Sequence, residues 1–285
     1  MAQSVVEVPK QVSVIGRRQP VVVRRIRYVS EQPPTAKARW TFQQPRACVV
    51  VEEAVELTDL RADGQRDAPT DSVTLVLLPT DAVSEAKKLG ESWLAPSDRS
   101  HTVPTTAFAS NNCKIQWRPG KAIIQGPSDG IERVVEAVVE FAFLEGELRR
   151  LERSLESQEA LAPGDVPRAH RIRFRHHKEW RRIGETVELL YSMRLTYGRL
   201  EAQFAIAPHV VPRESRQVLE RLVEESAIDH RMEGFSNRLE ACEDLYEGAN
   251  DRIADYHWYL EGTWMEATII VLLLIEIGLM AIDVF

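Results

Sequence analysis

The first candidate for a functional site is a cluster of three histidines, since His170, His176 and His177 lie within eight residues. Imidazole nitrogens bind transition metals, but a stable site needs three or four converging ligands. The carboxylate at ligand spacing there is Glu179 alone, so we predict an exposed helix start and not a metal site. The sequence also lacks GxxxxGK[ST], GxGxxG, GxSxG and HExxH patterns. We therefore expect no catalytic, cofactor-binding or metal-binding residues and no enzymatic activity.

A second candidate is the basic segment 168–182, which contains seven cationic residues and only one acid, Glu179. Phe174 and Trp180 lie among the cationic residues. The cationic residues are Arg168, Arg171, Arg173, Arg175, Lys178, Arg181 and Arg182. Such a patch suits the phosphates of RNA or of anionic lipid. The alternative is ion pairing with a preceding acidic helix, which carries Glu132, Glu136, Glu140, Glu145, Glu147, Glu152 and Glu156. The formal charge of −7 disfavours nucleic acid as a partner.

The third candidate is a pair of glutamates in an apolar tail, Glu266 and Glu276. A hydrocarbon core of roughly 30 Å needs about 20 helical residues, and Trp264 to Phe285 supplies them. A carboxylate at mid-bilayer costs about 2.5–3.5 kcal/mol, which the aliphatic residues around Glu276 offset. We predict a transmembrane helix with Trp264 at the interface; the alternative is a core helix buried in a soluble assembly.

Glu276 is expected to form a hydrogen bond across a helix interface and so to fix the geometry of an oligomer. The alternatives are a proton or ion role, or no special role. Glu266 lies about 15 Å away along the helix, so the two glutamates do not form one catalytic pair.

A long helical stripe positions these glutamates. After Pro212 the apolar residues follow an unbroken 3-4 spacing, which predicts one long helix packed against a partner. Its members are Met232, Phe235, Leu239, Cys242, Tyr246, Ala249, Ile253, Tyr256 and Leu260, then Thr263, Ala267, Ile270, Leu274, Ile277 and Ala281.

Upstream of the helices, residues 1–127 are typical of a mixed α+β domain. We predict strands at Val12–Ile15, Val21–Val29, Ala47–Val51 and Ser72–Leu78, loops at Gln32–Ala36 and Asp59–Thr70, a helix at Ala82–Leu94 and irregular chain at Ala95–Ala109. Pro119-Gly120 is typical of the two central positions of a type II turn, so Cys113–Trp117 and Ala122–Gln125 should form a hairpin. No motif in residues 1–127 identifies a protein partner for this domain.

Residues 128–262 are expected to be helical. A first helix should run from Ser128 to about Ala160 and end at Pro163-Gly164. A second should run from about Arg168 to Ala205 and end at Pro208, with a stripe of Trp180, Ile183, Val187, Leu190, Tyr197 and Phe204 that places Arg194 and Glu201 on the same seam. The second and third helices should form a long antiparallel hairpin. The predicted fold is therefore α+β, with long antiparallel helices and a single transmembrane segment at residues 263–285.

The tail resembles a known family. Met265-Glu266-Ala267, an Ile-rich stretch and Ile275-Glu276 are similar to the terminal L-E-W…I-E pattern of the required-for-meiotic-nuclear-division family, which includes YagE-like and Sad-interacting-factor relatives. The ten-residue spacing between the glutamates is kept. This chain has Ala267 where the family usually has Trp, which makes it a divergent member. The resemblance implies a membrane-anchored, oligomeric protein without an established enzymatic activity.

The expected function is therefore a tail-anchored scaffold or tether that forms homo-oligomers through its long helices and has the lipid bilayer as a partner. Three cysteines without CxxC spacing favour reduced thiols, as in a cytosol-like compartment. The expected location is the bacterial or the mitochondrial inner membrane, with the N-terminal domain in the cytosol or matrix. The Arg-rich first thirty residues resemble a mitochondrial transit peptide, although their β-branched residues favour strands.

Two alternatives stay open. One is a subunit of a membrane transport or channel assembly, because stalk helices that run into a span are loosely similar to CorA-type magnesium channels. Those channels carry a second span and a Gly-Met-Asn motif, and residues 1–285 contain neither. The other is an RNA- or lipid-phosphate-binding protein that uses the basic segment 168–182.

Overall fold

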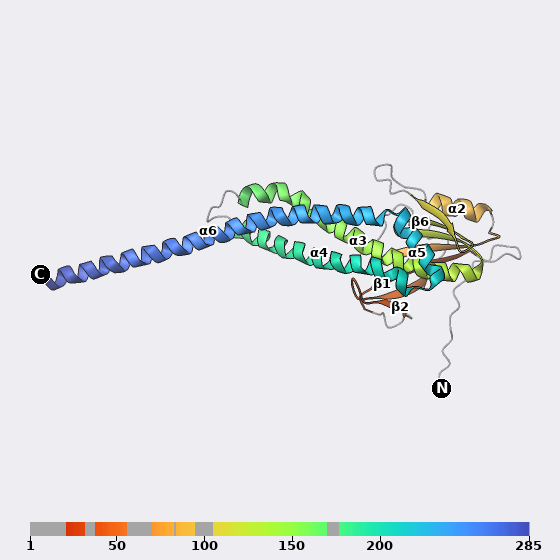
Figure 1. Ribbon diagram of the computed structural model, residues 1–285, viewed down its shortest axis with the longest axis horizontal. Coiled ribbons are helices and arrows are strands. Elements are labelled where there is room, and N and C mark those ends of the chain that lie inside the picture. Colours follow the sequence, from red (N-terminus) through yellow and green to blue (C-terminus); the bar gives the residue numbers. More distant parts are fainter. Residues whose placement is uncertain are drawn as a thin grey trace, which may run out of the picture. The chain divides into compact units, whose positions relative to one another are not determined.

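The computed structural model describes residues 21–31, 38–55, 70–82, 84–94, 105–169 and 177–284 (Figure 1). The predicted strand Val12–Ile15, the loop Gln32–Ala36 and most of the loop Asp59–Thr70 lie outside these ranges. In chain order the elements are β1 (Val22–Val29), β2 (Ala38–Phe42), β3 (Cys48–Ala54), β4 (Ser72–Pro79), α2 (Ser84–Leu94), β5 (Thr106–Ser110), β6 (Cys113–Arg118), β7 (Lys121–Gly126), α3 (Ser128–Ala169), α4 (His177–Val210), α5 (Arg213–Glu225) and α6 (Ile228–Val284). The predicted α+β class is confirmed.

The described strands form one seven-stranded sheet in the order β2-β3-β1-β4-β7-β6-β5. All neighbours are antiparallel except β4 and β7, which run parallel with Leu75 opposite Ala122. The predicted strands β1, β3 and β4 are confirmed within one to three residues at their ends. The strands β2 and β5 were not predicted, and β5 lies partly in a stretch expected to be irregular.

The two faces of the sheet bury different partners, because successive side chains of a strand point to opposite sides. On one face, Tyr28 of β1 donates a hydrogen bond from its hydroxyl to the carbonyl of Val139 in α3, at 2.8 Å. Trp117 of β6 packs edge-on against Phe141 of α3, with ring centroids 5.1 Å apart. The other face has its own buried cluster beside α2, formed by Val23, Val76, Leu78, Trp93, Leu94 and Ile123.

The β6–β7 hairpin leads directly into α3, as predicted. Gly120 has a φ of 74°, the left-handed conformation that favours glycine at the third position of a type II turn. At the end of β7, a Cβ atom on Gly126 would overlap the sulfur of Cys113 in β6. In the first turn of α3, a Cβ atom on Gly130 would lie 3.1 Å from the same sulfur, so α3 begins close to β6. All three cysteines are free and buried.

The predicted end of the first long helix was wrong. The helix α3 continues through Pro163 to Ala169, although a proline in a helix interior typically costs about 3 kcal/mol. Tertiary contacts offset that cost two residues later, where the buried side chain of Asp165 accepts a hydrogen bond from the hydroxyl of Tyr246 at 3.2 Å and pairs with Arg182.

The predicted stripe of α4 is only partly correct. Trp180, Ile183, Leu190 and Tyr197 are buried, but Glu201 is exposed and does not lie on the seam. Met193 and Leu200 are buried one residue before the predicted polar positions Arg194 and Glu201. The helix also extends through Pro208 to Val210, beyond its predicted end.

The predicted single helix after Pro212 is interrupted. The helix α5 ends at Glu225, and Ala227 adopts a φ of 49° before α6 begins. Glycine or asparagine usually occupies that left-handed conformation, which is unfavourable for alanine. Because the residue here is Ala227, the sequence gives no local signal for the break. The break lets α5 bury Ser215, Val218, Leu219 and Leu222 on a face of its own.

The chain divides into two compact units, residues Met1–Glu152 with Leu195–Phe235, and residues Arg153–Arg194 with Ser236–Phe285. The first unit contains the sheet, α2, α5 and the sheet-proximal parts of α3, α4 and α6. The second unit is helical, and in it the remaining parts of α3, α4 and α6 lie together (Figure 1).

Candidate functional site

In the second unit, the seam of α6 is buried as predicted from Leu239 to Ile253. Arg194 of α4 donates hydrogen bonds to Glu243 at 3.2 Å, so this predicted polar seam residue is half-buried and paired. Further along, Trp180 of α4 packs edge-on against Tyr256, with ring centroids 5.7 Å apart. Residue numbers rise along α6 as they fall along α4, which confirms the predicted antiparallel pairing of these helices.

Beyond Tyr256 the same helix becomes exposed. Trp258 is 80% exposed, and the large apolar side chains from Ile269 to Ile277 are 51–63% exposed. The predicted site residues Trp264, Glu266 and Glu276 all lie on this exposed part of α6. Within the described residues, no helix has an apolar stretch long enough to cross a membrane. The predicted C-terminal span therefore gains no support here.

The basic segment is described only at its C-terminal end. Arg181 pairs with Glu185 one turn later, at 2.8 Å, and Arg182 pairs with the buried Asp165 of α3. The side chains of Arg168, Arg171, Arg173, Arg175 and Lys178 lie outside the described part of the chain. Phosphate binding by this segment stays a prediction, and the two described arginines are both paired with acids.

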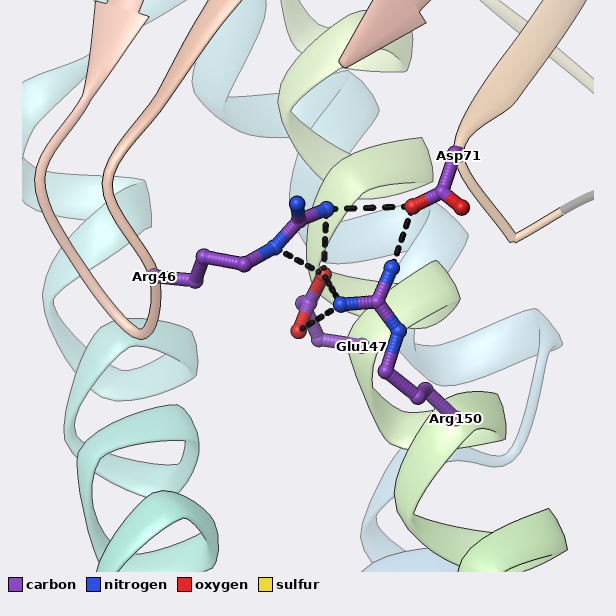
Figure 2. A network of polar contacts seen from close by, with 4 residues as sticks. All are labelled: Arg46, Asp71, Glu147 and Arg150. Atoms are coloured by element: carbon purple, nitrogen blue, oxygen red, sulfur yellow. Dashed lines mark hydrogen bonds and ion pairs between the residues drawn. The ribbon is translucent and has the colours of Figure 1, made fainter. Parts of the chain in front are cut away.

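A charged network in the first unit was not predicted as a site. Glu147 of α3 is almost fully buried and receives two arginines: Arg46, from the loop after β2, at 3.0 Å, and Arg150, one turn later in α3, at 3.3 Å. Figure 2 shows both guanidinium groups turned toward Glu147 and toward Asp71, which precedes β4. Asp71 accepts a hydrogen bond from Arg46 at 3.1 Å and pairs with Arg150. The network therefore ties two loops of the sheet to α3.

Gly146 makes this arrangement sterically feasible. A Cβ atom at this position would lie 2.6 Å from the carbonyl oxygen of Thr70, which is closer than real Cβ contacts allow. The backbone before Asp71 thus passes directly over α3 between Glu145 and Glu147. Only glycine at 146 permits this approach.

A second part of the network lies on the neighbouring side of α3. Glu145 is 1% exposed and binds Arg149 at 2.9 Å and Arg231 of α6 at 3.1 Å. Arg231 also binds Glu152 at 2.6 Å. Burial lowers the pKa of the Arg231 guanidinium, but its hydrogen bond to Glu152 and the charge of Glu145 outweigh that effect and raise the pKa.

The network holds segments of the first unit together. Its four carboxylates and four guanidinium groups balance in charge, and each carboxylate contacts at least one arginine. The alternative role of residues 168–182 was ion pairing with the acidic residues of α3; of those acids, Glu145, Glu147 and Glu152 pair with Arg46, Arg149, Arg150 and Arg231. The sequence shows only that these glutamates lie on a predicted helix rich in acids. It does not identify their partners, most of which come from distant segments.

The second unit also contains an open, apolar surface pocket of about 490 Å³ beside Cys242. Its other lining residues are Glu159, Ala162, Pro163, Arg238, Ala241 and Leu245, and Arg238 donates a hydrogen bond to Glu159 at 2.9 Å. Burial raises the pKa of the Cys242 thiol, which disfavours the nucleophilic thiolate. In the described residues, no three His, Cys, Asp or Glu side chains converge to hold a metal ion.

Comparisons with known proteins give little further guidance. No protein-family model and no curated protein matches the sequence. Solved structures with some similarity include the CorA magnesium transporter from Methanocaldococcus jannaschii, at 9% identity and a TM-score of 0.35, covering 90% of this chain and 80% of that one. Another is the ZntB cytoplasmic domain from Vibrio parahaemolyticus RIMD 2210633, at 10% identity and a TM-score of 0.26, covering 86% of this chain and 98% of that one. Similarity at this level shows neither a shared fold nor a shared function.

Proposed function

We propose that this chain is a non-enzymatic scaffold or tether, held at a membrane by the C-terminal part of α6 and active as a homo-oligomer. The observation that carries the proposal is the exposed apolar stretch of α6 from Ile269 to Ile277. Each large aliphatic side chain left in water forgoes about 1.5–3 kcal/mol relative to burial. A stretch of this kind needs a cover that the described chain does not provide.

The distribution of apolar side chains around α6 favours lipid as that cover. A helix that packs on one partner has an apolar stripe and a polar opposite face, whereas a helix apolar all round is buried in a core or a bilayer. From Ala267 to Ile275 the side chains are apolar except for Thr268, so no face is left polar. The apolar sequence continues from Ile277 to Ile282, beyond the last side chain that the structure describes.

The oligomeric part of the proposal rests on the α6 register. The 3-4 seam that packs inside the second unit up to Ile253 continues without interruption through Leu260, Ile270 and Leu274, which are half-buried to exposed. Copies of α6 placed side by side in a membrane would cover this seam. The resemblance of Met265–Glu276 to the required-for-meiotic-nuclear-division family supports the same assignment, with a bacterial or mitochondrial inner membrane as the proposed location.

Membrane fractionation tests the proposal. Full-length protein and a variant truncated after Gly262 are expressed in parallel, and membranes are washed with high salt and then with alkaline carbonate. We expect only the full-length protein to stay in the membrane pellet and to elute in detergent as a particle larger than a monomer. Full-length protein that is soluble without detergent would overturn the anchor.

A transport role is a second candidate because α6 is one continuous helix from Ile228 to Val284. It links Arg231, in the charged network of the first unit, to Glu276 in the apolar stretch. Ion flux into liposomes that contain the protein, compared with flux for Glu276→Gln, tests this role; absence of flux in both excludes it.

A further inference from the structure

Three exposed aromatic side chains encircle α6 just before its apolar stretch. Trp258 is 80% exposed, and Tyr259 and Trp264 are each 69% exposed. At about 100° per helical residue, Tyr259 lies about 100° and Trp264 about 240° around the axis from Trp258. A protein that packs on one side of the helix covers an arc of it, whereas a ring of this kind matches the plane of a membrane surface.

The axial extent of this ring is close to the thickness of a membrane–water interface. Trp258 and Trp264 are separated by about 9 Å along the helix axis. The headgroup layer on each side of a bilayer is roughly 5–8 Å thick, and Trp and Tyr concentrate there because their rings are apolar and their N–H and O–H groups are polar. The apolar stretch begins at Ala267, directly after the ring.

The two threonine hydroxyls between and after the aromatic rings form hydrogen bonds within the helix. The hydroxyl of Thr263 donates to the carbonyl of Tyr259 at 3.0 Å, and that of Thr268 donates to the carbonyl of Trp264 at 2.8 Å. Threonines with such hydrogen bonds need no water partner, so they add little to the cost of moving this part of α6 out of water.

The charge of this part of α6 indicates which membrane surface it suits. After Arg252 the sequence contains no Lys or Arg, while it contains Asp255, Glu261, Glu266, Glu276 and Asp283. Anionic lipid surfaces attract basic segments near the membrane and repel acidic ones. The acidic residues around the ring therefore favour a surface with little negative charge.

We infer that Trp258, Tyr259 and Trp264 form an aromatic collar that fixes the water boundary of α6 in the headgroup layer of a bilayer rich in zwitterionic lipid. This inference rests on the proposed membrane anchor and adds the position of the boundary and the class of lipid. A protein surface that covers the collar is the competing explanation.

Vesicle flotation and depth-dependent quenching test the collar with full-length protein. The chain has six tryptophans, of which Trp93, Trp117 and Trp180 are buried. Vesicles are made of phosphatidylcholine, with bromine atoms placed either near the headgroup or near the chain ends. We expect stronger quenching of tryptophan emission by bromine near the headgroup, and loss of that difference in the double variant Trp258→Phe, Trp264→Phe.

Lipid preference supplies a second readout. We expect a several-fold larger floated fraction with phosphatidylcholine than with an equimolar mixture of phosphatidylcholine and phosphatidylglycerol at low salt. The triple variant Trp258→Ala, Tyr259→Ala, Trp264→Ala should float several-fold less than the parent. Leu195→Ala, at an exposed apolar position of α4, is the matched control and should float like the parent.

The outcomes separate the collar from the anchor. If full-length protein floats, but quenching does not depend on depth and the triple variant floats equally, the collar is wrong and the anchor stands. If full-length protein does not float with either lipid, both are overturned. If full-length protein floats better with the anionic mixture, the inferred lipid class is wrong.

Discussion

The Nη1 atom of Arg231 lies 3.1 Å from Oε1 of Glu145, a carboxylate that is 1% exposed in the interior of the first unit. Arg231 belongs to the first turn of α6, and Glu145 lies on α3. The contact joins the start of the helix that carries the proposed membrane anchor to the helix that supports the sheet. Because a buried carboxylate without its partner is costly, this pair is a sensitive point for stability.

Replacing Arg231 with Met should therefore destabilise the protein. The substitution leaves Glu145 paired with Arg149 and removes the bonds to Glu152, so we expect a loss of about 3 kcal/mol in the free energy of unfolding. Urea unfolding measures it. Arg181→Ala is the control, because the exposed pair with Glu185 should contribute less than about 1 kcal/mol. Equal losses in the free energy of unfolding for the two variants would contradict the larger contribution proposed for the buried pair.

Gly146→Ala should cost about 1–3 kcal/mol, because the added methyl group collides with the carbonyl of Thr70 and displaces Asp71 from Arg150. Gly198→Ala in α4 is the matched control, since nothing lies within 4 Å of the added Cβ there. Its higher helix propensity should stabilise the protein by up to about 1 kcal/mol. Thermal unfolding of both variants checks the opposite signs; two shifts in the same direction would be evidence against the close backbone approach.

Glu140 should make stability depend on pH. Burial, and then the charge of Glu136, raises the pKa of the Glu140 carboxyl from 4.5 to about 7. A carboxyl whose pKa is raised by folding contributes its stability fully below pH 4.5 and loses it as the pH rises through about 7. Glu140→Gln should therefore gain stability relative to the parent between pH 5 and pH 8, as measured by urea unfolding.

Glu156→Gln is the control for this pH dependence. Glu156 is exposed on the same helix, so the substitution makes the same change in net charge without the burial. A gain with rising pH that is equally large for Glu156→Gln would assign the effect to net charge and not to the site at Glu140.

Glu276→Leu should separate anchoring from oligomerisation. Removing a carboxylate from the middle of the proposed span relieves a cost of about 2.5–3.5 kcal/mol, so membrane retention after carbonate extraction should persist. If Glu276 forms hydrogen bonds across helices, the particle in detergent should become smaller or mixed in size. Glu266→Leu, placed near the proposed interface, should leave the particle size unchanged. An unaltered particle with Glu276→Leu would remove Glu276 from the oligomer contact.

Short-range patterns were sufficient to predict much of the fold. The short runs rich in Val, Ile or Leu that form β1, β3 and β4, the Pro119-Gly120 turn and the seam from Met232 to Ile253 are each set by neighbouring residues, so they are visible in the sequence. The strands β2 and β5 were missed because both lie at edges of the sheet, where one neighbour and not their own pattern holds them in place.

Helix ends were less predictable because tertiary contacts override local preference. The extension of α3 past Pro163 depends on Asp165, whose partners Arg182 and Tyr246 lie on two other helices. Similarly, the break at Ala227 has no glycine to mark it, and it is the separate packing of α5 and α6 that requires it.

The sequence by itself determined the α+β class, the sequence of apolar stripes and the apolar, acid-flanked end of α6, because these depend only on residue type and spacing. Tertiary structure alone decided the charged network, because Arg46 and Asp71 come from distant loops and reach the region of Glu147 only when the sheet packs on α3, and Arg231 reaches Glu145 only when α6 packs there. It also decided where the α6 seam stops being covered. The spacing of that seam is the same on both sides of Ile253, and only the lengths and ends of α3 and α4 determine which part has a partner.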